Sequence, residues 1–388
     1  MNDTFLPFAL PCVGEEEINE VVDTLRSGWL TTGPKTKHFE EAFAEFVGVP
    51  YALAVNSGTA ALHLALEAIG IQAGDRVVTT PYTFTATAEV IRYFDADPLF
   101  VDIDPQTFNL DPQKLAQLLK TKSGIKAIMP VHFGGQACEM EKISSLAQDY
   151  GLKIVEDAAH AFPTSYQGRM IGTWGDLTAF SFYVTKTLAT GEGGMLVTTS
   201  SEYVEKIRIL RLHGINRDIF NRTTQQKPSW YYEVVAAGFK YNMTDIMAAI
   251  GIHQLHKTSR FLQRRTEIAN RYTQELADLP LFPPFVHPLS RPAWHLYVIQ
   301  LKLDELTINR DVFIEKMTAE GIGTSVHFIP LHIQPYWKNR YGFRPEDFPI
   351  SLEVYQRSVS LPIYPSMTDE EVGRVIKSVR KILSEAQR

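Results

Sequence analysis

Cysteine is scarce in this sequence, and long apolar runs are absent from it. Its 388 residues include two cysteines, Cys12 and Cys138, so one disulfide can form at most, and such low cysteine usage is typical of a reduced cytosolic protein. No apolar run approaches the ~18 residues needed to cross a bilayer, so we expect no membrane span. The first residues, MNDTFLPFALP, lack a basic segment followed by a long apolar core, which argues against a signal peptide. We therefore expect a cytoplasmic location.

An excess of positive charge is absent as well. The sequence has 38 basic and 44 acidic residues and a formal net charge of −6, so no global basic field attracts nucleic acid. Internal repeats, a Walker phosphate loop and a zinc-type Cys/His cluster are also missing. What remains is typical of a globular enzyme, with 45% hydrophobic and 21% charged residues in a chain long enough for two domains.

Short apolar runs alternate with helical patterns along the first part of the chain. We expect strands at 51–55, 76–80, 99–101 and 127–130, and helices at 60–69, 85–94, 112–119 and 140–150. Strands that alternate with helices of about ten residues favour a largely parallel sheet between two helical layers. The sequence therefore predicts an α/β fold with a three-layer large domain.

The end of the chain predicts a smaller α+β domain. Helical spacing persists over 246–276, with a charged interruption at 256–260 where we place the domain boundary, so the predicted domains are 1–255 and 256–388. After the proline-rich connector PLFPPFVHPLSRP we expect a strand at 294–303, a helix at 310–320 and a strand at 324–328. Thr368 and Glu371 form a capping-box pattern before the last helix.

The stretch 152–197 carries the strongest chemical signal. A short apolar run ends at Glu156 and Asp157, and a second run, 179–183, is followed by Lys186 in a loop rich in Thr and Gly. Ligands of open α/β sheets bind beyond the carboxyl ends of strands, where both groups fall. Pyridoxal phosphate is held by a lysine Schiff base and needs an acid opposite its ring nitrogen. Taken alone, however, a loop lysine and a strand-end acid are more often an ordinary loop residue and a helix cap than a cofactor site.

A second signal lies at the turn Asn56-Ser57-Gly58-Thr59, between an expected strand and an expected helix. The free backbone N–H groups at a helix start, together with a hydroxyl group, bind phosphate well. The alternative is that Ser57 only caps the helix.

The segments IVEDAAHA and SFYVTKTLATGEGGM closely resemble the signature of the DegT/StrS-type sugar-nucleotide aminotransferases, a branch of the fold-type I pyridoxal phosphate enzymes. The similarity extends over about residues 5–369. It implies that Lys186 forms the Schiff base with the cofactor, that Asp157 pairs with the ring nitrogen, and that His160 lies near the phenolic oxygen of the ring.

The resemblance also implies roles for residues outside these two segments. Gly58 and Thr59 correspond to ligands of the cofactor phosphate, and Ser181 corresponds to a further one. Phe84, in PYTFTATA, occupies the position of an aromatic residue that stacks on the pyridine ring, although an aromatic residue at a strand end is usually a core residue. The stretch SGWLTTGPKT corresponds to a loop that lies over the active site in the family, and its Thr32 is therefore a candidate for substrate contact.

One block departs from the family pattern. Many relatives have G-x-N-x-R, in which the Asn reaches the cofactor phosphate of the partner subunit, whereas this chain has Lys240 at the Asn position and Asn242 at the Arg position. A lysine is a point-charge substitute for such a ligand. The resemblance implies a homodimer with shared active sites, and the irregular stretch 216–237 is a candidate for a functional or interface loop.

Two histidines near the end of the chain, His327 and His332 in SVHFIPLH, have the spacing of a metal pair, but packing or substrate contact is the more common reason for such a pair. The family uses no metal, so we expect none here, and we assign His327 to substrate binding.

The resemblance implies a ping-pong transamination that moves an amino group from glutamate to a keto sugar linked to a nucleoside diphosphate. The segments FLPFALPCVGEEE, SGWLTTGPKT, RPAWHLYVIQL and GIGTSVHF look most like enzymes that aminate C4 of UDP-4-keto sugars, such as UDP-4-amino-4-deoxy-L-arabinose aminotransferases. Such enzymes serve the synthesis of lipopolysaccharides or other polysaccharides.

Three alternatives stay open at this stage. The first is amination at C3 or on another nucleotide. The second is the dehydratase branch of the family, which has His where Lys186 stands. The third is a cofactor-binding regulator without turnover, which has no need for a lysine that shuttles protons.

Overall fold

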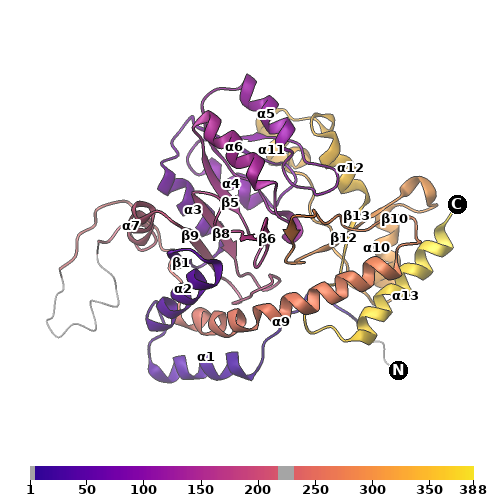
Figure 1. The fold of residues 1–388 in the computed structure, drawn as a ribbon, viewed down its shortest axis with the longest axis horizontal. Helices are drawn as coiled ribbons and strands as arrows, with labels where there is room; N and C mark the ends of the chain where they lie inside the picture. The colour runs from indigo at the N-terminus through magenta and orange to yellow at the C-terminus, as the bar shows by residue number, and fades with distance from the viewer. Residues whose placement is uncertain (1–4, 217–230) are drawn as a thin grey trace.

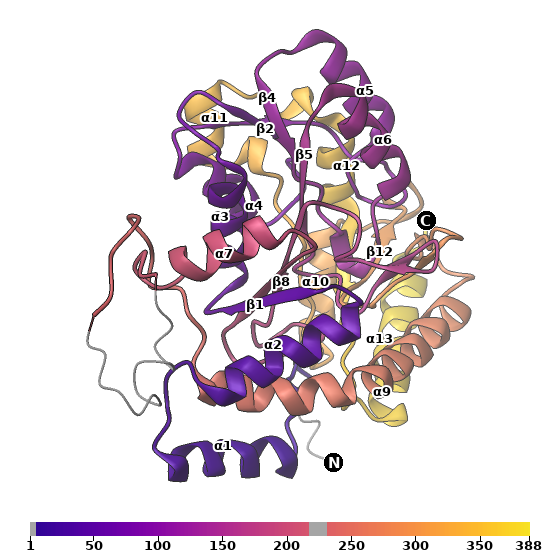
Figure 2. The ribbon, with the colours of Figure 1, turned by 60° about the vertical axis from the view of Figure 1, so that its left-hand side comes forward.

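The structure, a computed structural model, describes residues 5–216 and 231–388. At its centre is a seven-stranded sheet with the strand order β1-β9-β8-β5-β4-β2-β3 (Figures 1 and 2). Its strands are β1 (Tyr51–Val55), β2 (Arg76–Thr79), β3 (Asp97–Phe100), β4 (Ile125–Ile128), β5 (Lys153–Asp157), β8 (Leu177–Ser181) and β9 (Gly194–Thr198). The strands from β8 to β3 pair in parallel, and β9 runs antiparallel to both of its neighbours. The prediction of a mostly parallel sheet is confirmed.

Helices cover both faces of this sheet. They are α2 (Pro34–Val47), α3 (Gly58–Ile69), α4 (Thr85–Arg92), α5 (Pro112–Thr121), α6 (Met140–Tyr150), α7 (Ser201–Leu210) and α9 (Asp245–Glu275), while α1 (Glu15–Ser27) packs against α9 on the outside (Figure 1). Side chains alternate between the faces of a strand, so Ile154 of β5 packs in one core with α2, α5, α6 and α9, and Val155 packs in another core with α3, α4 and α7. Burial of each such side chain contributes about 1.5–3 kcal/mol. The predicted three-layer arrangement is confirmed.

The remainder of the chain builds smaller sheets and a second core. The strands are β10 (Leu281–Phe282), β12 (Tyr297–Leu301) and β13 (Ser358–Leu361) in one sheet, and β6 (Ser165–Tyr166), β7 (Arg169–Met170) and β11 (Ser290–Arg291) in another. The helices are α10 (Arg310–Ala319), α11 (Pro335–Tyr341), α12 (Pro349–Arg357) and α13 (Asp369–Ala386), with 3-10 turns η1 (Phe133–Gly135), η2 (Leu303–Glu305), η3 (Leu331–Ile333) and η4 (Pro345–Asp347). The predicted capping box is present, since Thr368 and Glu371 bond reciprocally.

The strand predicted at 324–328 is wrong. Only Ser325 pairs there, through an isolated bridge to Ser360 of β13. The chain then leaves the sheet, and His327 and Phe328 line the central cavity instead. Alternation of polar and apolar residues cannot distinguish a strand from a segment that lines a cavity.

The helix α9 is the longest element and connects the two cores. Figure 1 shows it running along the lower side of the molecule, from beside α2 to beside α13. It is unbroken at 256–260, where a charged interruption was expected, because the buried positions Leu255, Thr258 and Phe261 continue the inward face through that stretch. Leu255 belongs to the core of the large sheet, and Ile268 belongs to the C-terminal core. The predicted division between residues 255 and 256 thus falls inside a helix, and it stays a prediction.

Residues 217–230, most of the stretch predicted as a functional loop, lie outside the described residues. Among the residues that are described, no helix combines the length and the apolar character that a membrane span requires.

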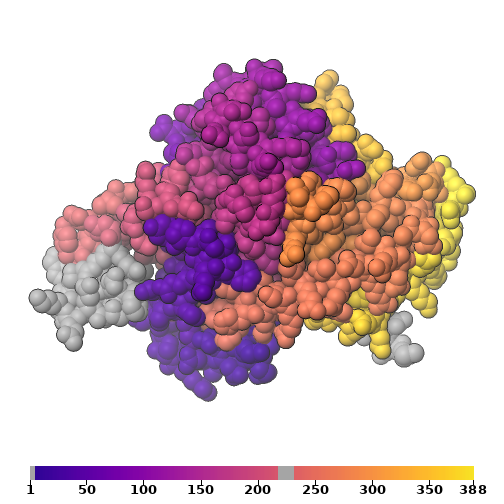
Figure 3. Space-filling view, in the orientation of Figure 1, coloured from indigo at the N-terminus to yellow at the C-terminus, as the bar shows by residue number. Residues whose placement is uncertain are grey.

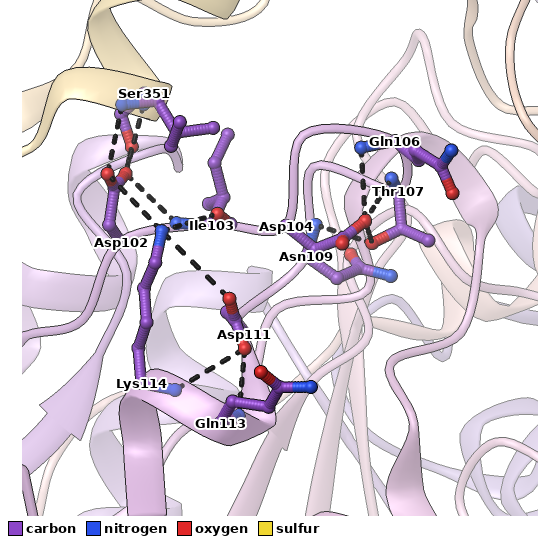
Figure 4. Close-up of polar contacts among 11 residues, drawn as sticks. Asp102, Ile103, Asp104, Gln106, Thr107, Asn109, Asp111, Gln113, Lys114 and Ser351 are labelled. Carbon is purple, nitrogen blue, oxygen red and sulfur yellow. Dashed lines mark hydrogen bonds and ion pairs between the residues drawn. The ribbon is translucent and has the colours of Figure 1, made fainter. Parts of the chain in front are cut away.

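A buried carboxylate fastens α12 to the large sheet (Figure 4). Asp102 follows β3 and accepts hydrogen bonds from the backbone N–H groups of Ile350 and Ser351, at 3.0 and 2.9 Å, and from the Ser351 hydroxyl at 2.6 Å. These amides lie in the first turn of α12, where no acceptor within the helix is available, and a negative charge is favourable there. Lys114 Nζ lies 3.7 Å from the same carboxylate. Asp102 therefore acts as a cap supplied from a distant part of the chain.

We predict that Asp102→Ala lowers the free energy of unfolding by about 2–4 kcal/mol, because buried donors of α12 lose a charged acceptor. Urea denaturation followed by circular dichroism measures the change. Asp104→Ala is the matched control. Asp104 accepts three hydrogen bonds, all of them from Gln106 and Thr107 of its own turn (Figure 4), so a loss of about 1 kcal/mol is expected. Equal losses for the two variants would contradict the capping role.

Candidate active site

A cavity of about 360 Å³ lies where β5 and β8 end. The two strands are parallel neighbours, so their carboxyl ends meet at the same edge of the sheet. Eight of the residues predicted from the sequence line this cavity: Gly58, Thr59, Phe84, Asp157, His160, Ser181, Lys186 and His327. Three others, Thr32, Lys240 and Asn242, are not among its lining residues.

Asp157 is a buried carboxylate held by two donors. The Thr87 hydroxyl donates to Oδ2 at 2.7 Å, and the backbone N–H of Ala159 donates to Oδ1 at 3.1 Å. Burial raises the pKa of Asp157 above its usual range, while these hydrogen bonds and the charge of Lys186 act in the opposite direction. A cation placed against this carboxylate would restore its ionised form, so the site favours a positively charged group beside Asp157.

Lys186 is a half-buried amine in the turn that follows β8. Its backbone N–H donates to the carbonyl of Tyr183 at 2.8 Å, which fixes the turn. Burial lowers the pKa of Lys186 to about 8, against the opposing influence of Asp157. A substantial fraction of the side chain is therefore an uncharged amine, the nucleophilic form, at mildly alkaline pH.

The start of α3 forms an anion-binding wall. The Ser57 side chain caps the helix by accepting from the Ala60 N–H at 3.0 Å, so the capping role considered from the sequence is confirmed. The amides of Gly58 and Thr59 have no acceptor within the helix because they belong to its first turn. A Cβ atom on Gly58 would lie 2.8 Å from Cβ of Ser181, so only glycine lets the helix start approach the end of β8 this closely. Amides, hydroxyl groups and a helix dipole together suit a phosphate monoester.

Phe84 precedes α4 and is 59% exposed although it lines the cavity. The expectation from general statistics, a core aromatic residue, does not hold. An exposed aromatic ring on a cavity wall supplies a flat apolar surface, and a bound ring that stacked on it would gain about 0.5–1.5 kcal/mol beyond the area buried. The ring of Phe328 lies 6.0 Å from that of Phe84 and belongs to the same wall.

Histidines form the wall near Lys186. His160 accepts from the Gly134 N–H at Nδ1, with a distance of 3.2 Å, so its neutral ring carries the proton on Nε2. Burial and the charge of Lys186 hold the pKa of His160 well below its usual range, and they lower that of His327 to about 4. His327 contacts Ser360 Oγ through Nδ1 at 2.9 Å. Both rings are thus neutral hydrogen-bonding groups at physiological pH.

The three predicted residues outside the cavity contact one another. Lys240 Nζ donates to Oδ1 of Asn242 at 2.5 Å, and Nδ2 of Asn242 donates to the Thr32 hydroxyl at 2.6 Å. The Thr32 hydroxyl in turn donates to the carbonyl of Met243 at 2.5 Å. Asn242 is therefore turned toward its own chain, and Lys240 is exposed.

Sequence reasoning missed several lining or supporting residues. The Thr87 hydroxyl donates its one proton to Asp157, so it must accept from Thr83, whose hydroxyl lies 2.7 Å away. The two threonines are four residues apart in TFTATA, a spacing that places them on one side of a helical turn and is the signal that could have indicated them. His295 also lines the cavity. No local pattern marks it, because it comes from the part of the chain that follows α9.

Pyridoxal phosphate matches this cavity group by group. An amine with a lowered pKa suits its aldehyde, a buried carboxylate suits its ring nitrogen, a helix start suits its phosphate, and an exposed aromatic side chain suits its ring. On the αβα scaffold described above, this combination defines the class of fold-type I pyridoxal phosphate enzymes.

Within that class, the chain belongs to the DegT/DnrJ/EryC1/StrS aminotransferase family, whose profile matches residues 11–380. The spore coat polysaccharide biosynthesis protein SpsC of Bacillus subtilis is 51% identical over 384 residues, 98% of each chain. A protein of Methanocaldococcus jannaschii, described only as uncharacterized, is 50% identical over 386 residues, 99% of each chain.

Solved structures agree with this assignment. A candidate sugar aminotransferase of Streptococcus pneumoniae, Spr1654, in its PMP form, superimposes with a TM-score of 0.90 at 33% identity over 98% of this chain and 99% of that one. Its PLP form gives a TM-score of 0.89. PseC of Helicobacter pylori, an aminotransferase involved in the biosynthesis of pseudoaminic acid, gives 0.90 at 29% identity over 98% of this chain and all of that one. The present chain is therefore a sugar aminotransferase that depends on pyridoxal phosphate.

We predict that the rate of covalent attachment of pyridoxal phosphate to the cofactor-free enzyme rises with pH and levels off above about 8, because only the neutral amine of Lys186 attacks the aldehyde. Below that pH the protonated amine predominates and attachment slows. Stopped-flow absorbance at a series of pH values measures the rate.

Borohydride reduction and peptide mass analysis then locate the attached group. A pyridoxyl group should be found on the Lys186 peptide, and Lys186→Arg should carry none. The assignment is overturned by a label on another lysine, and the lowered pKa by a midpoint near 10.5, the value of an ordinary lysine.

Proposed function

We propose that this enzyme moves an amino group from glutamate to C4 of a UDP-linked 4-keto sugar, and that the aminated sugar enters polysaccharide synthesis in the cytoplasm. The observation that carries the proposal is the cavity in which Lys186 and Asp157 meet within a sugar-aminotransferase fold. The polysaccharide role of SpsC and the amino-sugar role of PseC support a sugar substrate. The choice of UDP and of C4 rests on the resemblance of the four segments named above, which include RPAWHLYVIQL and GIGTSVHF.

Five lining residues hold the cofactor in this proposal. Gly58, Thr59 and Ser181 bind the phosphate, and Phe84 covers the ring. His160 donates its Nε2 proton toward the phenolic oxygen. When bound, the cofactor supplies an electron sink for the negative charge that develops on the reacting carbon.

Asp157 and Lys186 do the proton work. The carboxylate of Asp157 would hold a proton on the ring nitrogen of the bound cofactor and so keep that ring positively charged. The amine of Lys186, with a pKa of about 8, can both accept and donate a proton near neutral pH, so with the cofactor bound it would carry the proton to and from the reacting carbon of the substrate. His327 faces the same cavity as a neutral ring and contacts the sugar.

Two alternatives remain for the reaction itself. The first is amination at C3, or of a sugar on another nucleotide, since the same proton chemistry serves any ketone. The second is a regulator that binds the cofactor without turnover. The lowered pKa of Lys186 favours catalysis over regulation, because a residue that only anchors a ligand has no need to exchange protons near neutral pH.

We also propose a homodimer in which Lys240 reaches the cofactor phosphate of the partner subunit. Asn242 is engaged with the Thr32 hydroxyl of its own chain, whereas the charged end of Lys240 is exposed. Its one described contact is the amide oxygen of Asn242, which orients it without neutralising it. Of the two residues at the altered family positions, Lys240 is thus the better phosphate ligand.

We predict turnover with glutamate and UDP-4-keto sugars. The test is a panel of 4-keto and 3-keto sugars on UDP and on other nucleotides, in which 2-oxoglutarate formation and product mass are followed. A UDP-4-keto sugar should give the highest kcat/KM. A preference for a 3-keto sugar would show that the enzyme aminates C3 and not C4. If enzyme with bound cofactor turns over no sugar of the panel, the result favours the regulator.

The half-reaction with glutamate separates cofactor chemistry from sugar recognition. Lys186→Ala should lose turnover and still bind pyridoxamine phosphate. Asp157→Asn should keep the cofactor on Lys186 and lose at least about 10²-fold in rate, because the ring nitrogen loses its charged partner. Normal rates in either variant contradict the assigned roles.

We predict that mixed dimers distinguish a cross-subunit role of Lys240 from a role in its own site. Lys240→Glu should weaken cofactor binding about 10–100-fold, because one charged contact is lost and reversed. A dimer of one Lys186→Ala subunit and one Lys240→Glu subunit should regain one intact site, since the lysine beside that site comes from the first subunit. Cofactor dissociation constants and turnover measure the effect.

If Lys240 acts only within its own subunit, the mixed dimer contains no intact site and stays defective. Asn242→Ala is the matched control. It should disturb the hydrogen bond to Thr32 and show no recovery that depends on the partner.

A further inference from the structure

A segment from the C-terminal part of the chain is attached to the cavity wall that carries His160. The backbone N–H of Leu296 donates to the carbonyl of Gly134 at 3.1 Å, and that of Ala293 donates to the carbonyl of Gly135 at 3.0 Å. Gly134 is the residue whose own N–H donates to Nδ1 of His160. One short turn therefore joins the His160 ring to the segment 293–296.

The contact between these segments is close. Gly135 has a φ of +97°, and a Cβ atom on it would lie 3.1 Å from the carbonyl oxygen of His160 and from the backbone nitrogens of Trp294 and His295. Three stretches that are distant in the sequence thus converge at a point where only a glycine fits. The convergence fixes the backbone of His295 relative to that of His160.

The ring of His295 lies against the ring of His160. Their centroids are 4.4 Å apart, the shortest of the ring contacts that His160 makes among the described residues. Phe328 packs against His160 as well, at 5.7 Å. His160 is therefore held by one hydrogen bond at Nδ1 and by its contacts with neighbouring rings, and its Nε2–H is left to donate.

His295 does not have an ordinary structural hydrogen bond. Its side chain is 6% exposed, and its Nδ1 atom is buried without a hydrogen-bond partner. Because Nδ1 has no partner, the ring of His295 does not stabilise the structure through a hydrogen bond at this atom. Burial of an unpaired polar atom is in fact unfavourable. Its contribution is the surface that it presents to His160 and to the cavity that both residues line.

The surrounding charges support a neutral ring at this position. The groups that act on His295 are His160, Lys186, Arg265 and His327, and together with burial they hold its pKa well below the usual range. Arg265 of α9 is itself buried, and it donates to the backbone carbonyls of Trp294 and Ile363 at 3.1 and 2.7 Å. A cation beneath the segment disfavours a second positive charge on His295.

We propose that His295 is a positioning residue, whose contact with His160 keeps the Nε2–H of that histidine directed at the phenolic oxygen of the cofactor. The inference rests on the proposed role of His160 and adds to it the residue that holds the donor in place. Neither the sequence motifs nor the family signature quoted above assigns a task to His295.

The test is the absorbance of the bound cofactor as a function of pH, which reports protonation of the chromophore and requires no turnover. A donor beside the phenolic oxygen stabilises negative charge there, so displacement of the donor shifts the titration midpoint to higher pH. We expect His160→Ala to shift the midpoint upward by about 0.5–1 pH unit and His295→Leu to shift it in the same direction by a smaller amount. In the double variant His295→Leu should add nothing to the shift of His160→Ala.

The two single variants and the double variant together test the role of His160 and that of His295 separately. No shift in His160→Ala removes the proposed role of His160. A shift in His160→Ala without one in His295→Leu overturns the positioning role of His295 and leaves that of His160 intact. Equal and additive shifts show that His295 acts on the cofactor independently, which also overturns the inference.

Two further variants control for structure. His332→Leu replaces another buried histidine, which bonds to the carbonyl of Pro345 outside the cavity, and it should leave the spectrum unchanged. His295→Phe retains a ring without nitrogen atoms, and it should restore the midpoint to near the wild-type value if ring contact is what matters. Cofactor content and thermal melting curves confirm that each variant is folded, and His295→Asn replaces the leucine variant if that one does not fold.

Discussion

The site depends on an acid and an amine that share one cavity without pairing directly. In the part of the chain that the structure describes, no ion pair joins Asp157 to Lys186, and burial shifts the pKa of each toward its neutral form. A direct salt bridge would have satisfied both groups and left the amine permanently charged. Without such a bridge, Asp157 can accept a cation from a ligand and Lys186 can react as a neutral amine with an aldehyde. The chemistry therefore follows from two ionisable groups that the folded protein leaves without a charged partner of their own.

The scaffold that keeps these groups apart is built from both parts of the chain. The parallel pairing of β5 with β8 brings Asp157 and Lys186 to one edge of the sheet. The opposite wall comes from segments that follow α9, because the chain at His327 and Phe328 leaves the small sheet. The cap that Asp102 supplies to α12 and the continuous helix α9 fasten the second part to the first. The cavity can thus be shaped only when both cores are formed.

The sequence predicted well whatever depends on neighbours along the chain. Lys186 and Asp157 follow apolar runs that end at the sheet edge, and the turn Ser57-Gly58 signals a helix start, so all of these were found from local patterns. The interactions that complete the site join distant positions. Thr87 and Asp157 are 70 residues apart, and Gly134 and His160 are 26 apart. Nothing in either local pattern selects the partner.

Two stretches show where a local pattern stops being informative. The stretch 324–328 has the composition of a strand, but only Ser325 pairs with a strand, and His327 and Phe328 line the cavity. The charged residues at 256–260, where the domain boundary is predicted, interrupt the apolar pattern, but the inward positions on either side of them continue the face that packs into the cores. The resulting 31-residue helix passes from one core to the other. Tertiary packing overrides local propensity at both places, and a single sequence does not show what a segment will pack against.

The pKa of Asp157 has a consequence for how the cofactor and the protein affect each other. Burial favours the protonated form of Asp157 in the chain itself, and in the proposed complex a positively charged ring nitrogen beside this acid would favour the carboxylate. The two ionisations would then be coupled, and by reciprocity the carboxylate would stabilise the ring charge by as much as the ring charge stabilises the carboxylate. Thr87 and Ala159 reduce the cost of ionising Asp157 before the cofactor binds. If Asp157 has the proposed role, the hydrogen bonds from Thr83 to Thr87 and from Thr87 to Asp157 would set how strongly the charge of the ring changes the ionisation of the acid.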